Sequence, residues 1–400
     1  MFTEKQLDRY ADVLLWGLTT ARKKKFNKND IVLVRYNLQA LRLAEIIYEK
    51  LLAAGHNPIL RAGYTPWVEK RFFTLSNKEQ LIFEPPGEKE LVKHLNGSIS
   101  LIAPESLTHL SDVDPARIGR VATARKPLRD ILERRENNGD FSWTLGMFPT
   151  LALAEHAGIS TAAYTRQIVK ACFLDKIAPV DHWKNIYMNA REIKKRLNSL
   201  KIKSLRIESK RLDIEITPGA DRKWVGISGH NIPSFEIFLS PDWRGTSGVY
   251  FADMPAYRDG NLVKNLQVEF KNGRAVKITA DEGEKFARKL LATDPGAGRL
   301  GEFSLTDKRF SKINRYMANT LFDENFGGRQ GNCHIALGAS YADTFSGKPS
   351  ELTAARKKKL GFNESAIHWD IINTEKKCVT ATLNTGKKKV IYENGMFRES

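Results

Sequence analysis

The last third of the chain carries acidic and imidazole side chains on short segments that are rich in turn-forming residues. In chain order, the residues of this set that could do chemistry are Glu236, Glu302, Glu324, His334, Tyr341, His368 and Asp370. Carboxylate oxygens mixed with neutral imidazole nitrogens suit divalent ions of intermediate hardness, such as zinc, cobalt or manganese. The set therefore predicts a metal site, although no member predicts it alone.

Two segments of this set have the alternating pattern of strands. His368 and Asp370 stand two residues apart in an apolar segment, so a strand there would place both side chains on one face. An exposed polar face of an edge strand explains the pair equally well. Glu236 has aromatic and aliphatic neighbours, where a carboxylate is costly unless a cation or hydrogen bonds compensate it. The polar side of an alternating strand is the alternative explanation.

The remaining members lie in less regular surroundings. Glu302 follows a loop that contains proline and glycine, and loops on rigid scaffolds often carry functional residues. Glu324 lies in a turn-forming sequence and is the least specific member of the set. His334 lies in an apolar run with no other charged residue, which is more typical of a packed core histidine, and Tyr341 follows seven residues later.

The first half of the chain alternates between helix and strand patterns. Periodicity predicts helices over residues 1–25, 38–54, 115–135 and 151–174 and buried strands over residues 30–36, 57–61, 98–104 and 141–149. Strands that alternate with helices form βαβ units, so we expect an α/β domain with a mainly parallel sheet over residues 1–180. Neither common phosphate-binding glycine motif is present in this half.

The second half changes from a helical period to a period of two. After a basic helix over residues 182–199, alternating strands are predicted over residues 204–209, 212–217 and 266–270. Asn272-Gly273 is a strong hairpin signal and Thr385-Gly386 a weaker one. Further helices are predicted over residues 282–292 and 310–320. We therefore expect residues 181–400 to form an α+β domain that is rich in antiparallel sheet and contains the metal site.

Charge and composition limit the classes of partner. The net charge is +18, but the basic runs are short, adjoin turns or helix ends, and lack interleaved aromatic residues. Solvated surface explains them better than a nucleic-acid site does. No apolar run is long enough to span a membrane, and the N-terminus lacks the pattern of a signal peptide. The three cysteines are odd in number and far apart, which favours a reducing compartment, so cytoplasm is the expected location.

Taken together, the chemical residues and their order resemble the thermophilic aminopeptidase family, metallopeptidase family M29. The resemblance extends over essentially the whole chain and is strongest over residues 231–242, 301–302, 323–341 and 363–370. It implies a pair of divalent ions held by Glu236, Glu302, Glu324, His334, His368 and Asp370. Tyr341 matches a tyrosine of the same site. The segment between Glu324 and His334 is longer and richer in glycine than the shortest family version.

The resemblance further implies a function. A member of this family would release N-terminal amino acids from peptides with a free N-terminus, using two divalent ions (zinc, cobalt, manganese or magnesium), and would form a homodimer. Glu302 would bridge the ions, and Tyr341 would donate a hydrogen bond to the oxyanion. Two alternatives remain from other classes. One is a basic, non-catalytic binding protein on a peptidase fold, for instance for RNA, and the other is a metal-dependent hydrolase of another amide.

Overall fold

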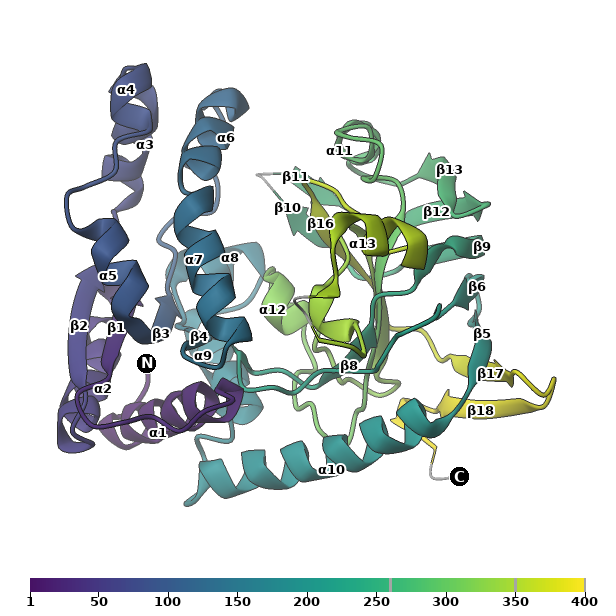
Figure 1. The fold of residues 1–400 in the computed structure, drawn as a ribbon, viewed down its shortest axis with the longest axis horizontal. Coiled ribbons are helices and arrows are strands. Elements are labelled where there is room, and N and C mark those ends of the chain that lie inside the picture. Colours follow the sequence, from purple (N-terminus) through teal and green to yellow (C-terminus); the bar gives the residue numbers. More distant parts are fainter. Residues whose placement is uncertain (259–260, 349–350, 399–400) are drawn as a thin grey trace. The chain divides into compact units, whose positions relative to one another are not determined.

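A computed structural model of the chain describes residues 1–258, 261–348 and 351–398 (Figure 1). The chain divides into two compact units. Residues 1–183 and 228–232 form the first, and residues 184–227 and 233–400 form the second. The proposal that residues 1–180 and 181–400 are separate domains stays a prediction.

The first unit is built around a parallel sheet. The strand order is β2-β1-β3-β4-β7, and every neighbouring pair is parallel. The strands are β1 (Ile31–Tyr36), β2 (Asn57–Ala62), β3 (Leu95–Ile102), β4 (Ser142–Met147) and β7 (Asn231–Ile232). Strand β1, which lies between β2 and β3, contains the apolar run that the sequence shows, and three of its residues are buried. The α/β class predicted for this half is confirmed.

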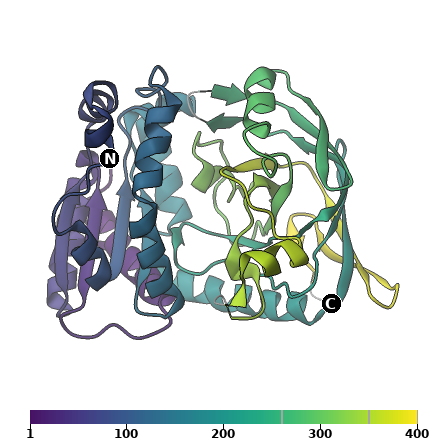
Figure 2. The same cartoon turned by 45° about the horizontal axis from the view of Figure 1, so that its top comes forward.

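The helices α1 (Glu4–Ala21) and α2 (Leu41–Ala53) pack against strands of the parallel sheet. The other helices of this unit, in the purple to blue-teal part of the chain in Figures 1 and 2, are the short η1 (Leu38–Ala40), α3 (Pro66–Leu75), α4 (Lys78–Leu81), α5 (Glu88–His94), α6 (Pro115–Ala124), α7 (Lys126–Asn137), α8 (Leu151–His156) and α9 (Thr161–Ala171). Ser160 caps α9 by accepting from the Ala163 N–H, and Gly55 takes a left-handed conformation directly after α2.

The single helix expected over residues 115–135 is wrong, because two helices occupy this region. α6 ends at Ala124 and α7 begins at Lys126. Pro127 stands at the start of α7, where its missing N–H costs nothing, whereas inside a continuous helix it would remove a hydrogen bond. The proline therefore determines where the second helix starts.

The second unit contains a large antiparallel sheet, and α10 (Pro179–Ser199) leads the chain into this unit. The strand order is β13-β12-β9-β6-β5-β17-β18-β19. These strands are β5 (Ile202–Glu208), β6 (Asp213–Thr217), β9 (Asp242–Ala252), β12 (Leu266–Lys271), β13 (Arg274–Thr279), β17 (Cys378–Leu383), β18 (Lys388–Glu393) and β19 (Met396–Phe397). Both predicted hairpins are present: Asn272 and Gly273 have positive φ between β12 and β13, and Gly386 has positive φ between β17 and β18.

A second antiparallel sheet in this unit carries most of the predicted site. Its order is β16-β15-β14-β8, with β8 (Glu236–Leu239), β14 (Leu300–Thr306), β15 (Asn332–Gly338) and β16 (His368–Asn373). The hydroxyl of Tyr250 on β9 lies 2.9 Å from the carbonyl oxygen of Ile371 and 3.1 Å from that of Cys333. The large sheet therefore packs against the rear of the four-stranded one. The smaller elements are β10 (Ala256–Arg258), β11 (Asn261–Val263), α11 (Glu284–Leu291), α12 (Thr320–Asp323), η2 (Ala342–Thr344) and α13 (Ala354–Leu360).

The helix expected over residues 310–320 is wrong. Only the short α12 begins in this segment, at its last residue. The backbone N–H groups of Met317 and Asn319 donate to the two carboxylate oxygens of Asp323, at 2.7 and 2.9 Å, and Ala318 has a positive φ. Side-chain acceptors thus replace the carbonyl groups that a helix would use.

Gly301 provides a test of how closely the site strand packs. It precedes Glu302 in β14, and a Cβ atom there would overlap the carbonyl oxygens of Gly338 and Ala339. We expect Gly301→Ala to lower the free energy of unfolding by about 1–3 kcal/mol, because the two strands must separate. Gly298→Ala is the matched control, since a Cβ there meets its nearest atom at 3.7 Å. Urea unfolding compares the two variants, and equal stability would contradict this packing.

Candidate metal centre

The register of the four-stranded sheet brings the predicted residues of distant segments to one face. Along β14, Glu302, Ser304 and Thr306 alternate onto the same face. Glu236 of β8 pairs with Thr306, and His334 of β15 pairs with Ser304. Three of the predicted residues therefore come from three adjacent strands and lie on the same side of the sheet.

The edge strand β16 carries the other two predicted site residues that lie on this sheet, His368 and Asp370. Ala336 of β15 pairs with Glu302 on one side and with Asp370 on the other, and Gly338 pairs with His368. The predicted strand containing His368 and Asp370 is confirmed, and the two residues share a face. Since alanine and glycine project little from β15, the longer acidic and imidazole side chains have room to approach one another above it.

The closest group is centred on His334. Its Nε2 atom lies 3.2 Å from Oε2 of Glu236 and 3.2 Å from Oε1 of Glu302. The candidate ligand atoms of these three residues all lie within 4.8 Å of one another, and all three residues are buried. Ser304 donates a hydrogen bond to Oε2 of Glu236 at 3.2 Å. This group can surround a cation.

A second group lies beside the first. Nε2 of His368 is 3.3 Å from Oδ1 of Asp370 and 3.8 Å from Oε2 of Glu302. The other ring nitrogen, Nδ1, lies 2.9 Å from the carbonyl oxygen of Ala339. A carbonyl only accepts, so Nδ1 donates, and in the neutral ring the lone pair is then on Nε2, which faces the carboxylates. Glu302 therefore stands between the two groups.

Glu324 reaches the cluster from a loop. It follows α12 directly and is buried. Asn325 connects it to the sheet, because its Oδ1 accepts the N–H of Phe235 at 2.5 Å while its Nδ2 lies 3.4 Å from Oε1 of Glu324. Thr306 and Asn332 both donate to the carbonyl oxygen of Glu324, at 3.2 and 3.0 Å. The loop is thus attached to the same strands that carry the other residues.

Tyr341 lies at the edge of the cluster. Its ring centroid is 4.6 Å from that of His368 and 6.0 Å from that of Phe238. The residue is 46% exposed, so substrate in solution could reach it. Burial of the hydroxyl and the nearby carboxylates of Glu302 and Asp370 raise the pKa of Tyr341 above its ordinary value. The hydroxyl stays protonated at neutral pH and can donate a hydrogen bond.

The electrostatics of the cluster are unfavourable without a cation. Burial raises the pKa of Glu302 to about 7, with a further contribution from Glu236. Burial and the neighbouring carboxylates also raise the pKa of Glu324. Oε2 of Glu302 is buried and has no hydrogen-bond partner among the described residues. Crowded carboxylates with an unsatisfied oxygen, together with imidazole nitrogens, fit the ligand chemistry of divalent ions.

Without a cation, protons on the two histidines partly compensate the negative charge of the carboxylates. Burial opposes a charge on His368, but Asp370 outweighs it and raises the pKa of this imidazole to about 9. His334 is affected in the same direction, since its two carboxylate partners overcome the effect of burial on its pKa. The pKa of Asp370 is lowered: burial acts against ionisation, and the charge of His368 exceeds that effect.

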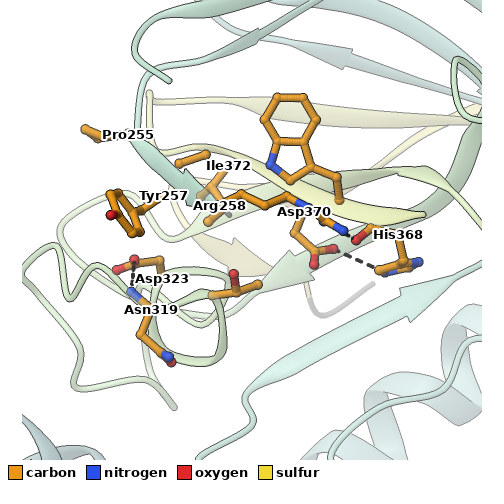
Figure 3. A pocket seen from close by; sticks show the side chains of 11 residues that line it. Pro255, Tyr257, Arg258, Asn319, Asp323, His368, Asp370 and Ile372 are labelled. Carbon is orange, nitrogen blue, oxygen red and sulfur yellow. Dashed lines mark hydrogen bonds and ion pairs between the residues drawn. The ribbon is translucent and has the colours of Figure 1, made fainter. Parts of the chain in front are cut away.

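A pocket of about 110 Å³ opens beside β16. Figure 3 shows His368 and Asp370 on one side of it, with Tyr257, Asn319 and Asp323 across the pocket. Nη1 of Arg258 donates to the carbonyl oxygen of His368 at 2.6 Å, which fixes this end of the strand. The pocket gives a small molecule access to the second group of the cluster.

The supporting residues were missed by sequence reasoning. The turn-forming pattern around Glu324 assigns no supporting role to Asp323 or Asn325, and the sequence around Ser304 contains no signal for its hydrogen bond to Glu236. The sequence does contain one signal for supporting residues, because the candidate ligand Glu324 has a polar residue on each side. It could not show that Asn325 reaches Phe235, which is 90 residues away in sequence.

Sequence comparison identifies related proteins. The model of the family described as thermophilic metalloprotease (M29) matches residues 3–397. The chain is 30% identical over 313 residues to aminopeptidase T of Thermus aquaticus, covering 72% of this chain and 73% of the relative. It is 28% identical over 335 residues to aminopeptidase AmpS of Bacillus subtilis (strain 168), covering 78% of this chain and 79% of that protein.

The fold agrees with these sequence relationships. The chain superimposes on wild-type AmpT from Thermus thermophilus with a TM-score of 0.81 at 21% identity, covering 99% of this chain and 100% of that structure. The match shows a shared arrangement of a parallel sheet and antiparallel sheets. From the family match over nearly the whole length, together with the relatives, it follows that this chain belongs to the thermophilic metalloprotease family M29.

Proposed function

We propose that the protein is an aminopeptidase that removes N-terminal residues from peptides with the help of two divalent ions. The observation that carries the proposal is the cluster of four carboxylates and two imidazoles on one side of the four-stranded sheet, of which three carboxylates and one imidazole are buried. The proposed ligands are Glu236, Glu302, Glu324, His334, His368 and Asp370. The family and the names of the relatives support the reaction type.

Charge balance supports two ions rather than one. Four ionised carboxylates carry four negative charges, and burying uncompensated charge is costly. Two divalent ions neutralise this charge, whereas one leaves half of it. The proposed ligands also form two groups in space, which favours two ion positions: His334 lies with Glu236, and His368 lies with Asp370. Glu302 faces both groups and would be shared. The mixed ligands suit zinc, cobalt or manganese, and magnesium remains an option.

Each protein residue has a proposed role in the reaction. When bound, divalent ions would lower the pKa of an attacking water and polarise the peptide carbonyl. A nearby carboxylate that binds neither ion, or Glu302 itself, would accept the proton of that water and pass it to the leaving amine. Tyr341 would donate a hydrogen bond to the oxyanion, a contact that contributes roughly 3–4 kcal/mol where donors of this kind have been deleted. An ion held by this cluster would also bind the free α-amino group of the substrate, which would limit cleavage to the N-terminal residue.

Assembly and location are also proposals. The resemblance favours a homodimer, which light scattering would reveal as twice the chain mass of 45.3 kDa. The three cysteines are free, in accord with the proposed cytoplasmic location. Separately, within residues 1–258, 261–348 and 351–398, every helix is too short or too polar to cross a bilayer.

Removing the metal should abolish the activity reversibly. After chelation, we expect release of p-nitroaniline from aminoacyl p-nitroanilides to stop, because the carboxylate cluster loses its cations. Zinc, cobalt or manganese, added separately, should restore it. The same substrates with an acetylated amino group serve as the control and should stay intact. Cleavage of the acetylated substrates would indicate a different amide hydrolase, and no turnover with any metal would favour a binding protein.

Glu302 is the residue whose replacement should have the largest effect. We expect Glu302→Gln to reduce kcat/KM by more than ~100-fold and to release most of the metal, since residues that only support ligands already account for 10–100-fold. Glu215→Gln, an exposed change on β6 of the same unit, is the matched control. Full activity and full metal content in the Glu302 variant would refute the two-ion scheme.

Metal binding should release protons. In the metal-free protein the pKa of His368 is raised to about 9 and that of Glu302 to about 7, so both hold protons at pH 6. Ions compete with these protons, and affinity should therefore rise from pH 6 to pH 9, about tenfold per unit for each proton displaced. Calorimetry in buffers of different ionisation enthalpy measures the number released. An affinity that does not change with pH would contradict the proposed ligands.

A further inference from the structure

Two arginines stand side by side on the parallel sheet of the first unit, away from the metal centre in sequence. Arg35 of β1 and Arg61 of β2 are register partners. Two residues earlier on the same face, Leu33 is buried and packs in an apolar cluster with Ile59. The face therefore changes from apolar to cationic at the penultimate residue of each strand, near the carboxyl edge of the sheet.

This pair is electrostatically unfavourable as it stands. Like charges directly opposite each other on neighbouring strands destabilise a sheet. Glu88 at the start of α5 compensates one of them, since both its oxygens accept from Nη1 of Arg61, at 2.8 and 2.9 Å. In the part of the chain that the structure describes, the Arg35 side chain has neither a hydrogen bond nor an ion pair. Burial and the charge of Arg61 lower the pKa of Arg35.

A third cation increases the excess of positive charge. Arg125 is the N-cap residue of α7, and the last turn of this helix is attached to the first residue of β3, because Arg135 donates to the carbonyl oxygen of Leu95. The start of α7 therefore lies toward the carboxyl edge of the sheet, where the charge of Arg125 repels that of Arg35. Its side chain likewise has no hydrogen bond or ion pair among the described residues. Both Arg35 and Arg125 are exposed, so a dissolved anion can reach them. Ser100 of β3 pairs with Arg35 and adds a hydroxyl to the same row.

The position agrees with a general rule for folds of this class. In open parallel sheets with helices on their faces, ligands bind outside the carboxyl ends of the strands. The order β2-β1-β3-β4 reverses direction between β1 and β3, and Arg35 lies on one of these two strands. Guanidinium groups match the geometry of phosphate and carboxylate with paired hydrogen bonds. Three arginines carry more positive charge than the single carboxylate of Glu88 can compensate, so a ligand with more than one negative charge would fit here.

We propose that Arg35, Arg61 and Arg125 form a binding site for an oxyanion, a phosphate or a carboxylate group, at the carboxyl edge of the parallel sheet. The site lies within the first unit and does not depend on the proposed peptidase reaction. Arg35 is the central member, because it adjoins Arg61 in the sheet and has no competing protein partner among the described residues.

Calorimetric titration of the full-length, metal-loaded protein tests the site. Pyrophosphate probes the phosphate class and succinate the carboxylate class, each at constant ionic strength. We expect at least one to bind, and Arg35→Gln and Arg125→Gln each to weaken it about tenfold or more, as expected for loss of a charged hydrogen bond. Lys5→Gln, which removes one exposed charge from α1, is the matched control and should bind like the parent.

Thermal unfolding distinguishes a binding arginine from a structural one. Without anion, Arg35→Gln should unfold at the same or a higher temperature, because repulsion is removed. With the bound anion, the parent should gain stability and the variant should not. Equal binding by the parent, the Arg35 variant and the Lys5 variant would overturn the proposal, since the anion would then occupy the metal centre or the general surface. Absence of binding by both probes would overturn it equally.

Discussion

The repulsion among four carboxylates, three of them buried, on one face of the four-stranded sheet is the constraint on which the site depends. Glu236, Glu302, Glu324 and Asp370 crowd together without a cation to compensate them, and burial with the neighbouring carboxylates raises the pKa of Glu302 and Glu324. A sheet can hold such a group because its backbone is fixed by neighbouring strands. Here the large sheet supports it from behind through Tyr250. The fold thus provides the rigidity that an unfavourable cluster requires.

The loop that carries Glu324 is fixed at its start. Thr306 and Asn332 bind the carbonyl oxygen of Glu324, and Asn325 binds the backbone next to Glu236. The glycine-rich segment that follows turns with Gly328 and Gly331 at positive φ. Glu324 is therefore held by contacts of its own backbone and of its neighbour, before the chain turns toward His334.

Much of this arrangement could be predicted from the sequence, and the rest could not for physical reasons. Local patterns predicted the parallel strands, the hairpin at Asn272-Gly273 and the shared face of His368 and Asp370. Register between strands could not be predicted, because Ser304 and His334 are 30 residues apart and only pairing brings them together. The expected helix over residues 310–320 failed because Asp323 binds its backbone N–H groups, a tertiary interaction that periodicity does not contain.

The central claim is that the cluster holds two divalent ions. Elemental analysis tests it most directly, on full-length protein equilibrated with zinc or cobalt and then freed of unbound metal by gel filtration. The account predicts two equivalents of metal per chain, because two ions neutralise the four carboxylates. A single equivalent, or none, would contradict it and would require the cluster to be compensated by protons instead.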